Sequence, residues 1–315
     1  MCGLFGFSTY QEKVAHDLTK LTNSLALQSS IRGSDATGVA FCVGGHIQIH
    51  KEAAPAHKLK FTHPGNIRAL IGHTRHATQG SEKQNRNNHP FSGRVPNTRF
   101  ALAHNGVLSN DDRLQKQYKF PQSKIETDSY VAVQLIERQK ELTFDSLRFM
   151  AETVSGSFSF SILDDQNNVY LVKGDSPLSI LHFPNERIYV FASTDEILYR
   201  SLIDSPLFDM LKEKEYEKIP ITCGTILKIG ADGKLETESF HFSDYVGRGW
   251  WEYGRYGLYE TGTTKGEKSM RDAYVEELKI HATYMGIDPD MVDELIGEGF
   301  TFDELEDYIY GYVGC

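Results

Sequence analysis

A cysteine stands directly behind the first methionine, in the segment MCGLFG. If Met1 is removed, Cys2 becomes the first residue and carries both a thiol nucleophile and a free α-amine. The pKa of an α-amine is about 7.7 to 8.0, so this group can accept the thiol proton near neutral pH and later donate it to a leaving group. Cys2 is therefore either an accident of sequence or the nucleophile of an active site.

Four other segments contain residue types that such a nucleophile needs. They are RGSDATG at 32–38, GHTRHATQG at 72–80, HNG at 104–106 and ETDSY at 126–130. Attack on an amide creates an oxyanion, which requires preorganised hydrogen-bond donors. A guanidinium can hold a carboxylate through two hydrogen bonds. The order of these segments behind MCGLFG matters more than any one of them.

In this order the five segments resemble the glutaminase domain of class II glutamine amidotransferases, which are N-terminal-nucleophile (Ntn) hydrolases. The later segments SGSFSFSIL, VKGDSPLSI and VFASTDEIL are also similar to that family, so the resemblance extends from Cys2 to the 230s. It implies that the substrate is L-glutamine and that the γ-amide is cleaved through a thioester at Cys2, giving glutamate and ammonia.

The resemblance also implies roles for individual positions. The side-chain amide of Asn105 and the backbone N–H of Gly106 match the oxyanion hole of the family. Arg75 matches the group that binds the α-carboxylate of glutamine, and Asp128 matches the acceptor for its α-ammonium. Thr78 is a candidate for a further hydrogen bond to the substrate.

Four more positions are expected to support the site, namely Arg32, Asp35, His76 and Gly80. In the family the segment around 32–38 lies beside the nucleophile, so an arginine there can orient the first strand and lower the thiol pKa. His76 and Gln79 stand where glucosamine-phosphate synthases commonly have Trp and His, in TRWATHG. We expect the pocket wall to differ from theirs at these two positions.

Each of these motifs also has a purely structural explanation. Asn-Gly is a common hairpin turn, and Asp128 could cap a helix N-terminus. Arg32 and Asp35 could close a turn as an Arg–Asp pair. The histidines at 73, 89 and 104 show no metal-ligand spacing, so we expect no metal and no cofactor.

Hydrophobic periodicity predicts an α+β fold. A helix is expected over 12–30, with Leu18, Leu21 and Leu25 on one face. Further helices are expected from Asp128 and over about 144–153, and short β-rich runs separated by turn residues indicate antiparallel sheets. ALIGHTRHATQG and FALAHNGVLS are both expected to deliver loops to one edge of a sheet, with a polar, mobile segment SEKQNRNNHPF between them.

With the resemblance, this pattern predicts a four-layer αββα sandwich and a small helical C-terminal extension. The expected domain is 2–245. A glycine- and aromatic-rich arm or linker is expected at 246–268, followed by an acidic helical tail at 269–315.

Composition restricts the partners. The chain has 315 residues, a formal net charge of -10 and a sequence pI near 5.6, which disfavours nucleic acid and anionic membranes as partners. No basic-then-apolar leader and no apolar run of roughly 20 residues is found, so a cytoplasmic location is expected.

About 70 residues follow the expected domain, too few for the second catalytic domain that usually consumes the ammonia. The sequence therefore predicts a stand-alone glutaminase that supplies ammonia to a separately encoded ligase or synthase. Two alternatives stay open. One is an Ntn amidohydrolase acting on a γ-glutamyl or other amide, and the other is an inactive binding module with this fold.

Overall fold

The computed structural model describes residues 2–11, 18–203, 205–242 and 287–298, together with single positions at 275, 278, 279, 282, 305 and 308. The chain divides into two compact units, 1–243 and 244–315. The expected linker at 246–268 lies outside the described residues.

The first unit contains two sheets in which all neighbouring strands pair antiparallel. The seven-stranded sheet has the order β11 (Glu217–Lys218), β9 (Ser179–Phe183), β10 (Ile188–Ala192), β1 (Gly3–Thr9), β4 (Ala69–Arg75), β2 (Ala36–Val43), β3 (His46–Glu52). The six-stranded sheet has the order β13 (Leu235–Ser239), β12 (Thr225–Ile229), β8 (Val169–Lys173), β7 (Gly156–Asp164), β6 (Thr98–Leu108), β5 (Phe91–Val95).

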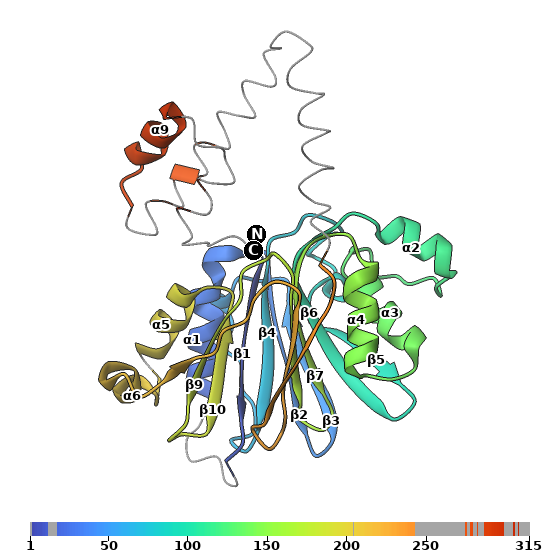
Figure 1. Cartoon of the computed structure of the whole chain (residues 1–315), viewed down its shortest axis with the longest axis horizontal. Helices are drawn as coiled ribbons and strands as arrows, with labels where there is room; N and C mark the ends of the chain where they lie inside the picture. The colour runs from blue at the N-terminus through green and yellow to red at the C-terminus, as the bar shows by residue number, and fades with distance from the viewer. Residues whose placement is uncertain are drawn as a thin grey trace. The chain divides into compact units, whose positions relative to one another are not determined.

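Helices lie outside the two sheets (Figure 1). They are α1 (Thr19–Ser29), α2 (Asp111–Tyr118), α3 (Tyr130–Gln139), α4 (Phe144–Thr153), α5 (Asp195–Ile203) and α6 (Phe208–Glu213). Short 3₁₀ turns are η1 (Ser30–Arg32), η2 (Ala56–Lys58) and η3 (Asn85–Asn87). In Figure 1, α1 and α5 cover the seven-stranded sheet, and α3 and α4 cover the six-stranded sheet.

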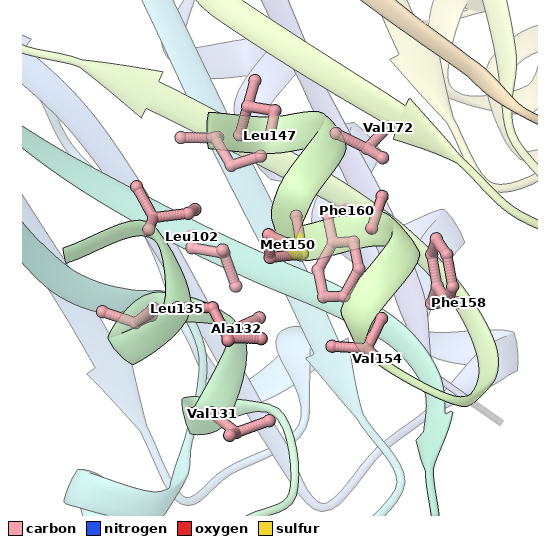
Figure 2. Close-up of a cluster of buried hydrophobic side chains, with 14 of the residues drawn as sticks. Leu102, Val131, Ala132, Leu135, Leu147, Met150, Val154, Phe158, Phe160 and Val172 are labelled. Carbon is pink, nitrogen blue, oxygen red and sulfur yellow. The ribbon is translucent and has the colours of Figure 1, made fainter. Parts of the chain in front are cut away.

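Three hydrophobic clusters fill the spaces between neighbouring layers. Between the sheets, Leu4 and Ile71 of one sheet pack with Leu163 and Leu171 of the other. Outside the seven-stranded sheet, the β1 phenylalanines at 5 and 7 pack against α1 and α5. Outside the six-stranded sheet, residues of α3 and α4 pack on β6 and β7, as Leu135, Met150 and Phe160 show in Figure 2. The layer order is therefore helix, sheet, sheet, helix, which confirms the α+β prediction.

β1, with the sequence GLFGFST, is apolar on both faces because it lies between the second sheet and the helices. Alternate residues of a strand point to opposite faces, and all seven residues of β1 are buried. Leu4 faces the second sheet while Phe5 and Phe7 face the helices. Gly6 allows close packing, since a Cβ there would lie 2.2 Å from the Leu70 carbonyl oxygen.

One expectation about the arrangement was wrong. The segments ALIGHTR and FALAHNGVL form β4 and β6, which belong to different sheets rather than to one sheet edge. The two strands meet across the sandwich, where Nε2 of His73 lies 2.9 Å from the carbonyl oxygen of His104. A ring N–H is the only donor of this pair, so His73 donates.

The second unit is described in part. It contains α9 (Asp290–Gly297), and Val292 of this helix packs with Leu278, Ala282 and Leu305. No helix among the described residues is both long enough and apolar enough to span a bilayer.

Candidate active site

Cys2 immediately precedes β1 and lies beside the end of β4, because Gly3 pairs with Thr74. The backbone N–H of His76 donates to the Cys2 Sγ at 3.4 Å. Nε of Arg32 donates to the Cys2 carbonyl oxygen at 2.9 Å, which fixes the backbone of Cys2. Burial raises the pKa of the Cys2 thiol, while the His76 N–H and the positive charges of Arg75 and Arg32 lower it.

Asp35 holds the segment that contacts the thiol. Its Oδ2 accepts a hydrogen bond from the Ala77 backbone N–H at 2.8 Å and lies 3.8 Å from Nδ1 of His76. Its own N–H donates to the Arg75 carbonyl oxygen at 2.9 Å. The described contacts of Asp35 are therefore with 75–77 rather than with Arg32, and they orient the N–H that points at Cys2.

Arg75 ends β4, and its side chain is 3% exposed. Nη1 donates to Oδ1 of Asn88 at 2.7 Å, and Nη2 donates to the carbonyl oxygens of Gln79 at 2.5 Å and Gly80 at 2.9 Å. All three acceptors are neutral, and no carboxylate of the described residues lies within 4.0 Å. A buried charge without a counter-ion is costly, so this position favours an anionic ligand group.

Gly80 and Thr78 lie in the segment after β4. Gly80 has a φ of +73°, and a Cβ there would lie 3.1 Å from Nδ2 of Asn87. Glycine therefore lets this backbone turn back to Arg75. Thr78 is exposed, and no hydrogen bond of its side chain is found within the described part of the chain.

Asn105 lies within β6, opposite Ser159 of β7. It is 2% exposed, and its Nδ2 is buried without an acceptor among the described residues. Buried amide donors are nearly always hydrogen-bonded in native proteins, so an exception needs an explanation. A ligand oxygen is the simplest missing acceptor.

Gly106 follows in the same strand and pairs with Phe158. Its φ is +130°, and a Cβ would lie 2.0 Å from the Ser157 carbonyl oxygen. Only glycine fits this position. Because Asn105 and Gly106 pair along β7, the structure excludes the hairpin turn that the Asn-Gly pair allowed.

Asp128 precedes α3 and is 4% exposed. Its Oδ2 accepts from the Leu108 backbone N–H at 2.6 Å, and its Oδ1 accepts from the Ser129 hydroxyl at 3.1 Å. No side chain caps α3, so the helix-cap explanation is wrong. The carboxylate instead joins the start of α3 to the end of β6.

Three buried histidines, His73 of β4, His104 of β6 and His89, lie close to one another where β4 and β6 meet. The ring centroids of His73 and His89 are 4.2 Å apart, and those of His89 and His104 are 6.4 Å apart. Burial lowers the pKa of His73 to about 3 and lowers the pKa values of the other two. Within the described ranges, no group of His, Cys, Asp or Glu is placed to hold a metal ion.

The site residues come from both sheets and meet where the sheets touch. Cys2 and Arg75 belong to the seven-stranded side, whereas Asn105 and Gly106 belong to β6. The hydrogen bond from His73 to the His104 carbonyl joins the residue two before Arg75 to the residue before Asn105. The Cys2 thiol, the Asn105 amide donor without an acceptor among the described residues and the buried Arg75 guanidinium therefore share one end of the sandwich.

Part of the chain is similar in sequence to known proteins. Residues 73–200 match the family model described as a glutamine amidotransferase domain. These residues therefore belong to a glutamine amidotransferase domain. The curated relatives of this domain include glutamine–fructose-6-phosphate aminotransferase (isomerizing) from Geobacillus kaustophilus, 31% identical over 191 residues, and the enzyme of that name from Staphylococcus aureus strain Mu50, 33% identical over 190 residues.

The matches cover 57% and 56% of this chain but only 30% of each relative, so the chain matches less than a third of their length.

Two solved structures have a similar fold. The allosteric regulatory enzyme of purine biosynthesis superposes with a TM-score of 0.61 at 22% identity, covering 77% of this chain and 50% of that chain. Glutamine phosphoribosylpyrophosphate amidotransferase from B. subtilis gives 0.58 at 23%, with the same coverage.

The sequence interpretation missed two residues of the amidotransferase domain. Asn87 and Asn88 are 0% and 1% exposed, although they lie in the segment expected to be polar and mobile. Asn88 contacts Arg75, and Asn87 contacts Glu126. Their only sequence signal is two adjacent asparagines before His-Pro.

Proposed function

We propose that this domain hydrolyses the γ-amide of L-glutamine to glutamate and ammonia, with Cys2 as the nucleophile. The observation that carries the proposal is the buried Nδ2 of Asn105, a donor without an acceptor among the described residues. The oxyanion formed when a thiolate attacks an amide is an acceptor of the right kind. Arg75, buried among neutral acceptors, would bind the α-carboxylate, and Asp128 would accept from the α-ammonium.

The proposed reaction has two halves. The α-amine of Cys2, freed by removal of Met1, takes the thiol proton, and Sγ attacks the γ-carbonyl carbon. Asn105 and the Gly106 N–H stabilise the oxyanion. The C–N bond then breaks, the protonated amine gives its proton to the departing nitrogen, and ammonia leaves a thioester. Water, deprotonated by the same amine, cleaves the thioester to release glutamate and regenerate the thiol.

The test combines mass spectrometry of the mature N-terminus with a glutaminase assay. We expect Met1 to be absent and Cys2→Ala to abolish glutamate formation. Cys42→Ala is the matched control, because Cys42 is also a free thiol but lies buried in β2. Activity that survives Cys2→Ala would overturn the mechanism.

We propose further that the ammonia passes to a separately encoded ligase or synthase. The names of the curated relatives describe aminotransferases that use glutamine, which supports transfer of the nitrogen rather than its loss. A slow basal glutaminase rate that rises when a partner from the same cell is added is the expected result. Full turnover by the isolated chain would favour a free hydrolase instead.

A further inference from the structure

Asn88 is the side-chain partner of Arg75. Its Oδ1 accepts from Nη1 of Arg75 at 2.7 Å, and both side chains are buried. Its Nδ2 donates to the Glu82 carbonyl oxygen at 2.8 Å and to Oδ1 of Asn85 at 3.2 Å. Because both amide protons are engaged, Oδ1 is the atom that must face the guanidinium.

The neighbouring Asn87 holds the segment that leads to Asp128. Its Oδ1 accepts from the Glu126 backbone N–H at 3.0 Å. Its Nδ2 donates to the Ser81 carbonyl oxygen at 3.1 Å and to Oε2 of Glu126 at 3.0 Å. The amide of Asn88 therefore contacts Arg75 itself, whereas the amide of Asn87 contacts Glu126, two residues before Asp128.

We propose that Asn87 and Asn88 are positioning residues that set the spacing between Arg75 and Asp128 and so restrict the site to α-amino acids. The inference rests on the proposed glutaminase function, and it identifies the residues that determine the substrate specificity of that function. An α-amino acid carries its carboxylate and ammonium on one carbon, so the groups that bind them must be held at one separation. Two adjacent, buried side chains at the end of η3 provide that link.

The choice of asparagine at position 88 follows from charge. A neutral amide oxygen orients the Arg75 guanidinium but leaves its charge free to attract a carboxylate. Aspartate has nearly the same shape, but it would form a buried ion pair with Arg75 and compete with the ligand. Asn88→Asp therefore separates the positioning role from a merely structural one.

The experiment measures how well small acids protect Cys2 from alkylation by iodoacetamide. L-glutamate carries both charged groups of the substrate, glutarate lacks the α-ammonium, and 4-aminobutyrate lacks the α-carboxylate. In the unsubstituted protein we expect L-glutamate to protect at the lowest concentration. Asn88→Asp should raise the L-glutamate concentration needed for half-protection by about 10- to 100-fold, as expected for loss of the charged hydrogen bond between Arg75 and the ligand α-carboxylate. The 4-aminobutyrate concentration needed for half-protection should stay unchanged.

Asn87→Ala should give the complementary result, weakening protection by L-glutamate but not by glutarate. The matched control is Asn185→Asp, an exposed asparagine between β9 and β10 that contacts Glu215, and it should change nothing. If Asn88→Asp does not fold, Asn88→Ala serves in its place, with the same ligand selectivity expected.

Equal losses for all three acids in the Asn88 and Asn87 variants would overturn the inference, as would unchanged protection by L-glutamate. These results leave the proposed function intact. Failure of L-glutamate to protect the unsubstituted protein would overturn the proposed function itself, and the inference with it.

Discussion

The backbone N–H of His76 points at the Cys2 sulfur, 3.4 Å away, and the carboxylate of Asp35 holds the next residue in place. A thiolate gains more from such a donor than a thiol does, so the contact lowers the thiol pKa against the effect of burial. Asp35 therefore influences the Cys2 thiol through the backbone of 76–77.

Asp35→Ala should raise the thiol pKa of Cys2 by about one unit, because a hydrogen bond to a charged group contributes about 1.5 to 3 kcal/mol and one unit corresponds to about 1.4 kcal/mol. The pH dependence of Cys2 alkylation measures this. Asp111→Ala is the control, since Asp111 also bonds the loop after β4, through Gln79, but not the backbone at 76–77. A larger shift for Asp111→Ala would contradict the assignment.

Asn105→Ala should reduce kcat by about 100- to 1000-fold, as loss of one oxyanion donor does, with little change in KM. Stability should change by less than about 1 kcal/mol, because Nδ2 has no acceptor to lose among the described residues. Steady-state kinetics measures the loss of kcat, and urea unfolding measures the change in stability.

Asn110→Ala is the matched comparison for Asn105→Ala. Nδ2 of Asn110 donates to the Thr153 carbonyl oxygen at 2.9 Å, and its Oδ1 accepts from the Ser155 N–H at 2.9 Å. Here we expect the reverse, a loss of about 1 to 3 kcal/mol of stability with activity retained. The same profile for both variants would refute the special role of Asn105.

Gly106→Ala should destabilise the protein by more than about 2 kcal/mol, because a Cβ 2.0 Å from the Ser157 carbonyl oxygen forces β6 and β7 apart. Gly45→Ala is the comparison: Gly45 has a positive φ of +77°, but a Cβ added there would lie more than 4 Å from every other heavy atom considered. It should cost only about 1 kcal/mol. Thermal or urea unfolding compares the pair, and similar costs would show that backbone conformation alone matters at Gly106.

Acid should destabilise the fold below pH 6.5. The unfolded chain binds protons at its histidines near that pH, whereas burial lowers the pKa of His73 to about 3 and that of His89 well below the ordinary value. The unfolded state therefore binds more protons, and stability falls with falling pH by up to about 1.4 kcal/mol per unit for each buried histidine.

Urea unfolding between pH 5.5 and 7.5 checks this pH dependence. His89→Asn should reduce the slope of unfolding free energy against pH by the equivalent of about one bound proton. His46→Gln, at an exposed position in β3, should leave that slope unchanged. A flat profile in the unsubstituted protein would show that the buried histidines take up protons while folded.

Local signals predicted much of the fold. The helix expected over about 144–153 is α4 (Phe144–Thr153), where Thr143 accepts from the Ser146 N–H in a capping box. The turn between β2 and β3 is formed by Gly44 and Gly45, whose positive φ values of +56° and +77° are ones that glycine permits. These features depend on residues close together in the sequence, so the sequence alone determines them.

Other features depend on partners that are distant in the chain. Asn87 and Asn88 look like solvent-exposed loop residues, but Arg75 and Glu126 supply buried partners for them. Asn105-Gly106 looks like a turn, yet β7 pairs with it along a strand. The order of motifs predicted which residue types occur, while only the folded structure shows which atoms they contact.

The position of β1 has a consequence for the order in which its sheet forms. β1 pairs with β4 and also with β10 (Ile188–Ala192), which is much later in the chain. At about 5 to 20 residues per second, β10 follows roughly 10 to 40 s later. Throughout that interval β1 lacks one of its two neighbours, so the seven-stranded sheet cannot be completed until β10 has been synthesised.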